Sequence, residues 1–186
     1  MMRAFVAVDL SSEVKENLNS LLAQLRRLKA DVKWVKENSL HLTLKFLGEI
    51  SEKEAAKVVA ILEAISSDYA PFQLSFRSVG QFPEKGSPRV FWVGIEPSPA
   101  LLYLQERLDI ALEKEGFARE TRDFHPHLTL GRVKSLRGCE LVRRELKKYE
   151  NCSFGQMEAN ALTLFQSFLR PEGAEYKIIH QVKLGR

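Results

Sequence analysis

The chain has 186 residues, of which 45% are hydrophobic and 28% are charged, and its net charge is +4. This size and composition predict one compact unit with its own core, and the sequence has no apolar run of 18 residues that would predict a membrane span. The apolar stretch within residues 1–9 is too short for a secretory signal, so we expect a cytoplasmic protein with no membrane partner.

The first elements in the chain are a predicted strand and a predicted helix. Residues 3–8 favour a strand, and Ser11 or Ser12 caps a helix whose apolar positions recur at helical spacing to residue 28. Residues 33–35 can start another strand. Residues 40–47 then alternate with period two, which predicts that their side chains point to opposite faces in turn. One predicted face has Leu40, Leu42, Leu44 and Phe46, and the other has His41, Thr43 and Lys45.

The rest of the chain continues to mix helices and strands. Helices are predicted after the capping-box pattern of residues 51–54, between Pro99 and Gly116, and over residues 140–149. Strands are predicted at residues 72–79, 90–95, 127–133, 153–157, 161–169 and 175–184, with a turn at residues 170–173. Because no run of regular βαβ units is present, we predict an α+β fold with largely antiparallel sheets.

The tetrapeptide His-Leu-Thr-Leu occurs twice, at residues 41–44 and at residues 127–130. Two of only four histidines lie in these copies, so coincidence is a poor explanation. The copies are separated by about half the chain, and a helix is predicted before and after each one. We therefore infer a duplicated unit whose pseudo-twofold axis brings the two histidine strands face to face.

The repeated motif has the groups needed for acid–base chemistry at phosphorus. One imidazole can take a proton from an attacking water while the other protonates the departing oxygen. Strand alternation places Thr43 beside His41 and Thr129 beside His127, where the hydroxyls can donate to phosphate oxygens. A single His-x-Thr in a strand is more often a cross-strand pair, but the duplication favours catalysis. This chemistry needs no metal and no cofactor.

The other two histidines are weaker candidates. His125 precedes His127 by two residues, so the pair could form a His-x-His metal site, but without nearby acidic or cysteine ligands a structural role is favoured. His180 is predicted to share a strand face with Tyr176 and Ile178, as an ordinary sheet residue.

Basic and aromatic residues offer further contacts to nucleic acid. The basic run at residues 143–148 is typical of a solvated helix face, although it could follow an RNA backbone. Arg119 and Arg122, just before the second motif, are better placed to meet a polynucleotide. Three aromatic residues could stack a base but are core residues by default, namely Trp34, Phe46 and Trp92.

Together these motifs resemble a known family. Residues 3–8, 40–48 and 124–132 are similar to the 2H phosphoesterases, in the branch of RNA 2',3'-cyclic phosphodiesterases, also called 2'-5' RNA ligases. Residues 166–169, Gly173 and Tyr176 fit the last hairpin of that family. The resemblance covers essentially the full length, and its paired HxTx motifs are specific.

The resemblance implies a single bilobal domain over residues 1–186. Its two pseudo-twofold-related lobes would have helices on their outer faces and an active site in the central cleft. The implied enzyme is a hydrolase that opens an RNA-terminal 2',3'-cyclic phosphate to a 2'-phosphomonoester. In reverse, the same histidines could join a cyclic phosphate to a 5'-hydroxyl through a 2'-5' bond.

The resemblance also assigns roles to individual residues. His41 would be the proton donor to the leaving 3' oxygen, and His127 the proton acceptor that activates water. Thr43, Thr129 and Arg132 would hold the phosphate. Strict alternation from His127 places Arg132 on the opposite face, so it reaches the phosphate only if the strand bulges, with Gly131 as the expected point.

The expected partner is RNA with a 2',3'-cyclic phosphate end, tRNA fragments being one source, and nucleotides are further candidates. The chain is expected to be a monomer, without metal or cofactor. The alternative function is a non-catalytic module that binds RNA ends or nucleotide phosphates. Salt-dependent RNA binding without hydrolysis would favour that alternative.

Overall fold

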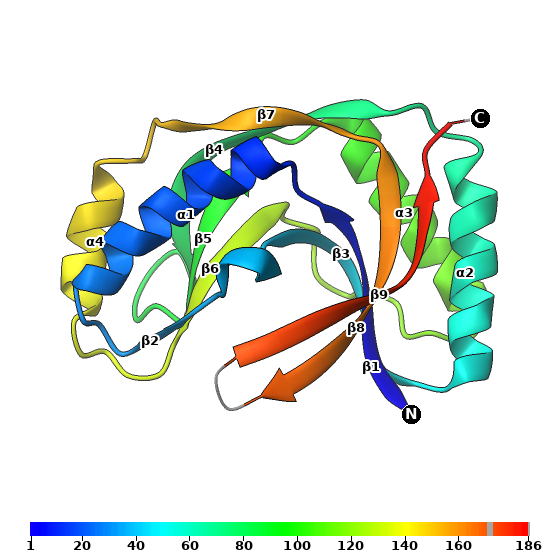
Figure 1. Cartoon of the computed structure of the whole chain (residues 1–186), viewed down its shortest axis with the longest axis horizontal. Helices are drawn as coiled ribbons and strands as arrows, with labels where there is room; N and C mark the ends of the chain where they lie inside the picture. The colour runs from blue at the N-terminus through cyan, green and yellow to red at the C-terminus, as the bar shows by residue number, and fades with distance from the viewer. Residues whose placement is uncertain (171–172, 186) are drawn as a thin grey trace.

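The computed structural model describes residues 1–170 and 173–185, which form two antiparallel sheets with four α-helices (Figure 1). The four-stranded sheet has the order β3 (His41–Ile50), β1 (Met2–Asp9), β8 (Ala161–Arg170) and β9 (Gly173–Lys183). The five-stranded sheet has the order β2 (Val32–Trp34), β6 (His127–Val133), β5 (Val90–Ile95), β4 (Phe72–Phe82) and β7 (Ser153–Ala159). The predicted α+β class with largely antiparallel sheets is confirmed.

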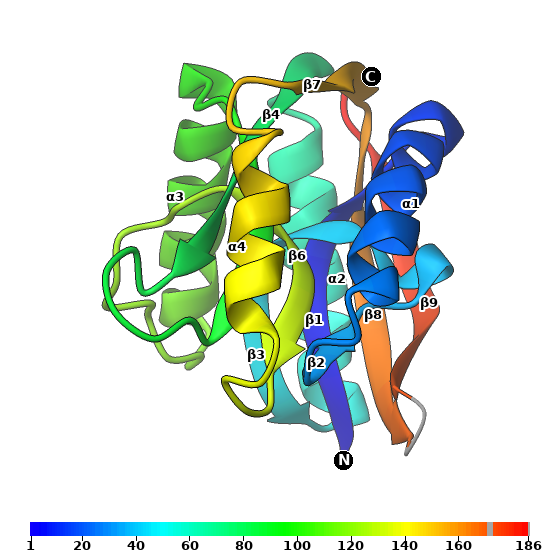
Figure 2. The same cartoon turned by 90° about the vertical axis from the view of Figure 1, so that its left-hand side faces the viewer.

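The helices divide between the sheets. Helices α2 (Glu52–Ser66) and α3 (Pro99–Lys114) pack on each other and against the four-stranded sheet, whereas α1 (Ser12–Arg27) contacts β7 and α4 (Cys139–Lys147) contacts β4. Viewed from the end that carries α4, Figure 2 shows α4 and α1 in front and α2 and α3 farther back. None of the helices in the described ranges is long and apolar enough to span a membrane.

Local sequence explains where the helices begin. Ser11 is the N-cap of α1, because its hydroxyl accepts a hydrogen bond from the backbone N–H of Val14 at 3.3 Å. The predicted capping box of α2 is formed in full, with the Glu54 carboxylate accepting from the Ser51 N–H at 2.7 Å. The turn predicted at residues 170–173 includes residues 171–172, which lie outside the described ranges.

The two sheets repeat one strand order, which reveals the duplication. The series β3-β1-β8-β9 corresponds to β6-β5-β4-β7, and β2 is an extra edge strand beside β6. The helices cross over: α1 follows β1 but packs on the five-stranded sheet, and α3 follows β5 but packs against β3. Each half of the sequence therefore contributes to both lobes, so the repeated unit is interleaved rather than a separate lobe.

Apolar packing divides each sheet into two faces. The helix-covered faces share one hydrophobic core, which includes Val6, Leu42, Leu128 and Leu164. On the other face of the four-stranded sheet, Phe5, Ala7 and Phe165 form a smaller cluster against Tyr176. This second face carries the first histidine motif.

Candidate active site

The first motif ends in a β-bulge. In the pairing of β1 with β3, Ala7 lies opposite Thr43 but Val6 lies opposite Lys45, so Leu44 is the extra residue. Beyond it the faces exchange: Lys45 is only 6% exposed, whereas Phe46 is 63% exposed and lies near Phe5 at 5.9 Å between ring centroids. The prediction that Lys45 shares the His41 face and that Phe46 is in the core is therefore wrong, because the bulge reverses the alternation.

The second motif bulges at the equivalent leucine. Trp92 pairs with Thr129 and Phe91 pairs with Gly131, so Leu130 is the extra residue of β6. The bulge returns Arg132 to the face that carries His127 and Thr129. The expected bulge is thus present, one residue before the predicted position.

Gly131 has a separate role in this strand. A Cβ atom at residue 131 would lie 2.6 Å from side-chain atoms of both Val32 and Trp34. Glycine therefore lets the edge strand β2 approach β6 closely at the bulge. In the first motif the equivalent residue after the bulge is Lys45, and the equivalent of Arg132 is Phe46, so the two halves differ in chemistry at positions where their backbones agree.

His41 is packed among aromatic rings. Its imidazole stacks on Phe5 at 4.6 Å between centroids and meets Tyr176 edge-on at 4.9 Å. Burial lowers the pKa of His41 to about 4, and a backbone hydrogen bond at Ser39 and the charge of Asp9 oppose that shift. In the free protein the ring is therefore neutral near pH 7.

His127 is oriented by the chain that precedes it. Its Nδ1 lies 2.7 Å from the carbonyl oxygen of His125, and its ring meets Phe82 edge-on at 5.0 Å. Because a carbonyl can only accept, Nδ1 carries the hydrogen and the Nε2 lone pair of the neutral ring is free. Burial lowers the pKa of His127, the hydrogen bond to His125 opposes this, and the positive charge of Arg132 lowers the pKa further.

The charge of Arg132 acts on groups beside both motifs. Its charge lowers the pKa of His127, and it also acts on Tyr176, whose pKa is raised by burial and lowered in part by Arg132. Tyr176 in turn contacts the ring of His41. Strands β3 and β6 also contact each other although they belong to different sheets. The fold therefore brings the two strands that carry the motifs into contact, and Arg132 acts on His127 and on Tyr176, the neighbour of His41.

A groove of about 370 Å³ adjoins His127. Its lining includes Phe82, Trp92, His125 and Pro126, and the ring of Trp92 lies over Gly80, where a Cβ atom would come within 2.2 Å of it. Among the residues that the structure describes, no group of three His, Cys, Asp or Glu side chains could hold a metal. The alternative of a His125–His127 metal pair therefore gains no third ligand.

The remaining predicted contacts divide between the core and the surface. His180 lies 3.3 Å from Glu63 of α2, because a shift in the β8–β9 register separates it from the face of Ile178. The prediction that His180 shares a strand face with Ile178 is therefore wrong.

Trp34 packs against the core as expected and stacks near Phe91. Arg119 is paired with Asp109 at 3.8 Å and with Glu113 at 3.6 Å.

Three neighbours of the histidines are not predicted as site residues by the sequence, namely Phe5, Asp9 and Phe82. Each lies on a strand other than those of the motifs. The local sequence of one strand does not predict which side chains of the adjacent strand lie next to it. Tyr176 is predicted only as part of the last hairpin. Partners of this kind can be identified only when the strand pairing is known.

Comparison with known proteins gives consistent matches over almost the full length. The family model described as LigT like Phosphoesterase matches residues 8–92 and again residues 93–176. A relative from Archaeoglobus fulgidus named RNA 2',3'-cyclic phosphodiesterase is 41% identical over 176 residues, covering 95% of this chain and 97% of that protein. The crystal structure of a Thermus thermophilus protein has 30% identity and a TM-score of 0.85, covering 98% of each chain.

A ligand-bound structure is also similar. E. coli LigT complexed with 3'-AMP has 25% identity and a TM-score of 0.79, covering 100% of this chain and 99% of that one. The two matches to one family model divide the chain near its middle, in agreement with the repeated strand order.

Proposed function

This chain belongs to the LigT-like phosphoesterase family, and on that premise we propose that it hydrolyses RNA-terminal 2',3'-cyclic phosphates to 2'-phosphomonoesters. The observation that carries the proposal is that β3 and β6, the strands of the two bulged motifs, contact each other although they belong to different sheets. The name of the 41%-identical relative supports the reaction, and the E. coli LigT complex with 3'-AMP supports a nucleotide-sized ligand.

His127 is the proposed proton acceptor. Its Nδ1–H donates to the His125 carbonyl, which leaves Nε2 available to take the proton of an attacking water. Arg132 favours the neutral ring that a base requires. The water oxygen bonds to phosphorus as the bond from phosphorus to the 3' oxygen breaks, which leaves the phosphate on the 2' oxygen.

His41 is the proposed proton donor to the departing 3' oxygen. The charge of Asp9 favours its protonated form, although burial holds the pKa of the free protein at about 4. A bound phosphodiester brings a negative charge to this buried ring, which raises the pKa and loads the proton when substrate is present. Thr43 and Thr129 are the proposed hydroxyl donors to the nonbridging oxygens, and Arg132 the charged contact. These groups together need no metal ion.

The test is turnover of a short RNA with a 2',3'-cyclic phosphate end in excess chelator. His41→Ala and His127→Ala should each lower kcat by at least about 100-fold, because each removes one proton-transfer group. The other two histidines of the chain provide matched controls: His180→Ala should retain activity, and His125→Ala should retain most of it because the backbone carbonyl remains.

The chemical identity of the product distinguishes hydrolysis from 2'-5' ligation and from RNA binding without turnover. A 2'-phosphate end is expected, whereas a 2'-5' joined strand formed with a 5'-hydroxyl RNA would indicate that ligation also operates. Full activity in either catalytic variant would refute the paired-histidine mechanism. Tight, salt-dependent binding with no product from the wild type would instead identify a binding module for RNA ends.

A further inference from the structure

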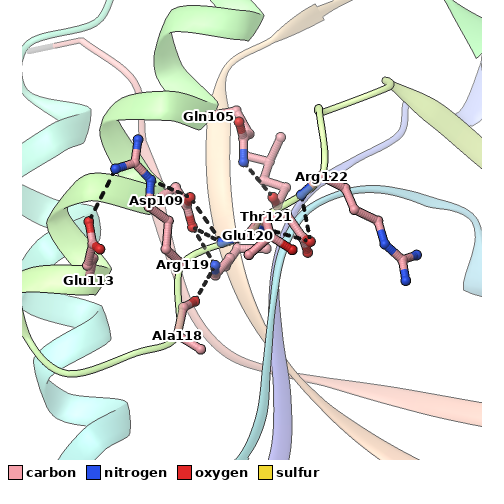
Figure 3. Close-up of polar contacts among 10 residues, drawn as sticks. Gln105, Asp109, Glu113, Ala118, Arg119, Glu120, Thr121 and Arg122 are labelled. Carbon is pink, nitrogen blue, oxygen red and sulfur yellow. Dashed lines mark hydrogen bonds and ion pairs between the residues drawn. The ribbon is translucent and has the colours of Figure 1, made fainter.

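A buried polar cluster joins β3 to α3 and to the loop that follows α3 (Figure 3). Lys45 and Asp109 are 6% and 7% exposed and form an ion pair. The Lys45 ammonium also donates to the carbonyl oxygen of Ala118 at 2.6 Å. Charges are expensive to bury, and apolar residues of similar size would stabilise such a position at least as well. Stability alone therefore does not explain why Lys45 and Asp109 are charged.

One face of α3 contacts the first motif and the loop that precedes the second motif. Gln105 and Asp109 are four residues apart, so they project from the same side of the helix. The Gln105 amide lies 3.5 Å from the carbonyl oxygen of Leu44, the bulge residue of the first motif. The Asp109 carboxylate accepts from the backbone N–H of Glu120 at 3.3 and 3.4 Å.

The contacts to residues 118 and 120 hold the loop that leads to the second motif. Residues 117–126 between α3 and β6 form neither helix nor strand. Within the loop, the Glu120 side chain accepts from the N–H groups of Thr121 and Arg122 at 3.2 and 3.3 Å. Near the end of the loop, the carbonyl of His125 orients the His127 ring. The contacts from the strand of His41 thus extend to residue 122 of the loop, and residues 123–124 connect it covalently to the carbonyl that orients His127.

We infer that Lys45 and Asp109 are a positioning pair, which fixes the loop of residues 118–126 against β3 and so sets the orientation of His127 relative to His41. This inference rests on the proposed catalytic use of the two histidines. Neither member of the pair touches substrate, because both side chains lie on the helix side of the sheet. Apolar residues could fill the space but could not bind the Ala118 carbonyl and the Glu120 amide.

The informative variant is the double substitution Lys45→Met with Asp109→Leu. It removes both charges together, so no unpaired charge is left in the core and the protein should fold, with a melting temperature within about 4 °C of the wild type. The loop should nevertheless lose its anchor. We expect kcat to fall roughly 10- to 100-fold while KM changes less than about twofold, because small displacements of a reacting group are costly.

Two further measurements do not depend on turnover. Hydrogen exchange at the amide of Glu120 should become at least about 10-fold faster in the double variant. The imidazole ¹⁵N shifts of His127 should change from one dominant Nδ1–H form to a mixture of tautomers. If the wild type has no activity, the proposed function fails, but these two readouts still decide whether the pair positions the loop.

Glu54→Ala is the matched control, since it removes the capping box of α2 without touching the loop. It should lower the melting temperature without changing kcat, loop exchange or the His127 tautomer. Unchanged kcat and unchanged Glu120 exchange in the Lys45–Asp109 double variant would overturn the inference and leave the pair with a packing role only.

Discussion

At the scale of single residues, the two histidines share one motif but have different surroundings. His41 is packed against Phe5 and Tyr176 with Asp9 favouring its protonated form, whereas His127 has the cation Arg132 beside it. At His41 the charge of Asp9 outweighs the opposing charge of Lys15, so the neighbouring charges favour the protonated ring there and the neutral ring at His127. Burial lowers both pKa values and is the largest cause at each ring, so it is the proposed acid role of His41 that requires the negative charge of a bound substrate.

This environment predicts different pH profiles for the free and the substrate-bound enzyme. In the free protein a protonated His41 and a neutral His127 coexist only below the ordinary histidine pKa of about 6.5, so kcat/KM should be greatest at acidic pH. The phosphate charge raises both pKa values in the complex, so the optimum of kcat should lie at higher pH. Steady-state kinetics between about pH 4 and pH 9 measure the optimum of kcat/KM and the optimum of kcat. We expect the two optima to lie on the order of one pH unit apart. Coincident optima would contradict the role assigned to the substrate charge.

At the scale of elements, a β-bulge decides which side chains share a face with each motif. The extra residue Leu130 brings Arg132 back to the face of His127, and the extra residue Leu44 sends Lys45 to the helix side. The same kind of bulge therefore places a charged arginine on the His127 face of β6 and a lysine in contact with α3 in β3. The equivalence of the two bulges, in strands of different sheets, also supports the internal duplication.

The close approach of β2 to β6 depends on the absence of a side chain at residue 131. Gly131→Ala should destabilise the fold by about 1–3 kcal/mol, because the new Cβ atom meets Val32 and Trp34 at 2.6 Å. It should also raise KM by displacing Arg132. Urea denaturation followed by circular dichroism measures the first effect. In a Trp34→Leu background, Gly131→Ala should lower the free energy of unfolding by less. An equal loss in both backgrounds would show that the contact with Trp34 does not cause the destabilisation.

At the scale of the whole molecule, the crossing of α1 and α3 between the sheets has a mechanical consequence. Each lobe is completed by a helix from the other half of the chain, and the helix-covered faces share one hydrophobic core. We therefore expect residues 1–186 to behave as one cooperative domain despite the two sheets.

Unfolding experiments on the intact chain test this expectation. Both tryptophans, Trp34 and Trp92, lie in the five-stranded sheet, so their fluorescence reports on that lobe alone, whereas far-ultraviolet circular dichroism reports on both. The two signals should change together in one urea transition. Two separated transitions would indicate lobes that unfold independently, contrary to a single domain.

The sequence by itself determined the parts of this protein that depend on local pattern. Period-two alternation identified the strands of both motifs, capping residues identified where α1 and α2 begin, and the repeated tetrapeptide predicted the duplication. The alternation and the caps each lie within about ten residues of chain, where backbone geometry alone relates sequence to structure, and the duplication needs only a comparison of two short segments.

Only the tertiary structure decided what depends on pairing between distant segments. The bulges arise from the register of β3 against β1 and of β6 against β5, so alternation alone misplaced Lys45 and Phe46. The contact of Lys45 with Asp109 joins residues 64 positions apart, and the crossing of the helices joins opposite halves of the chain. Such contacts are fixed by packing and hydrogen bonding across the whole fold, so no local sequence pattern predicts them.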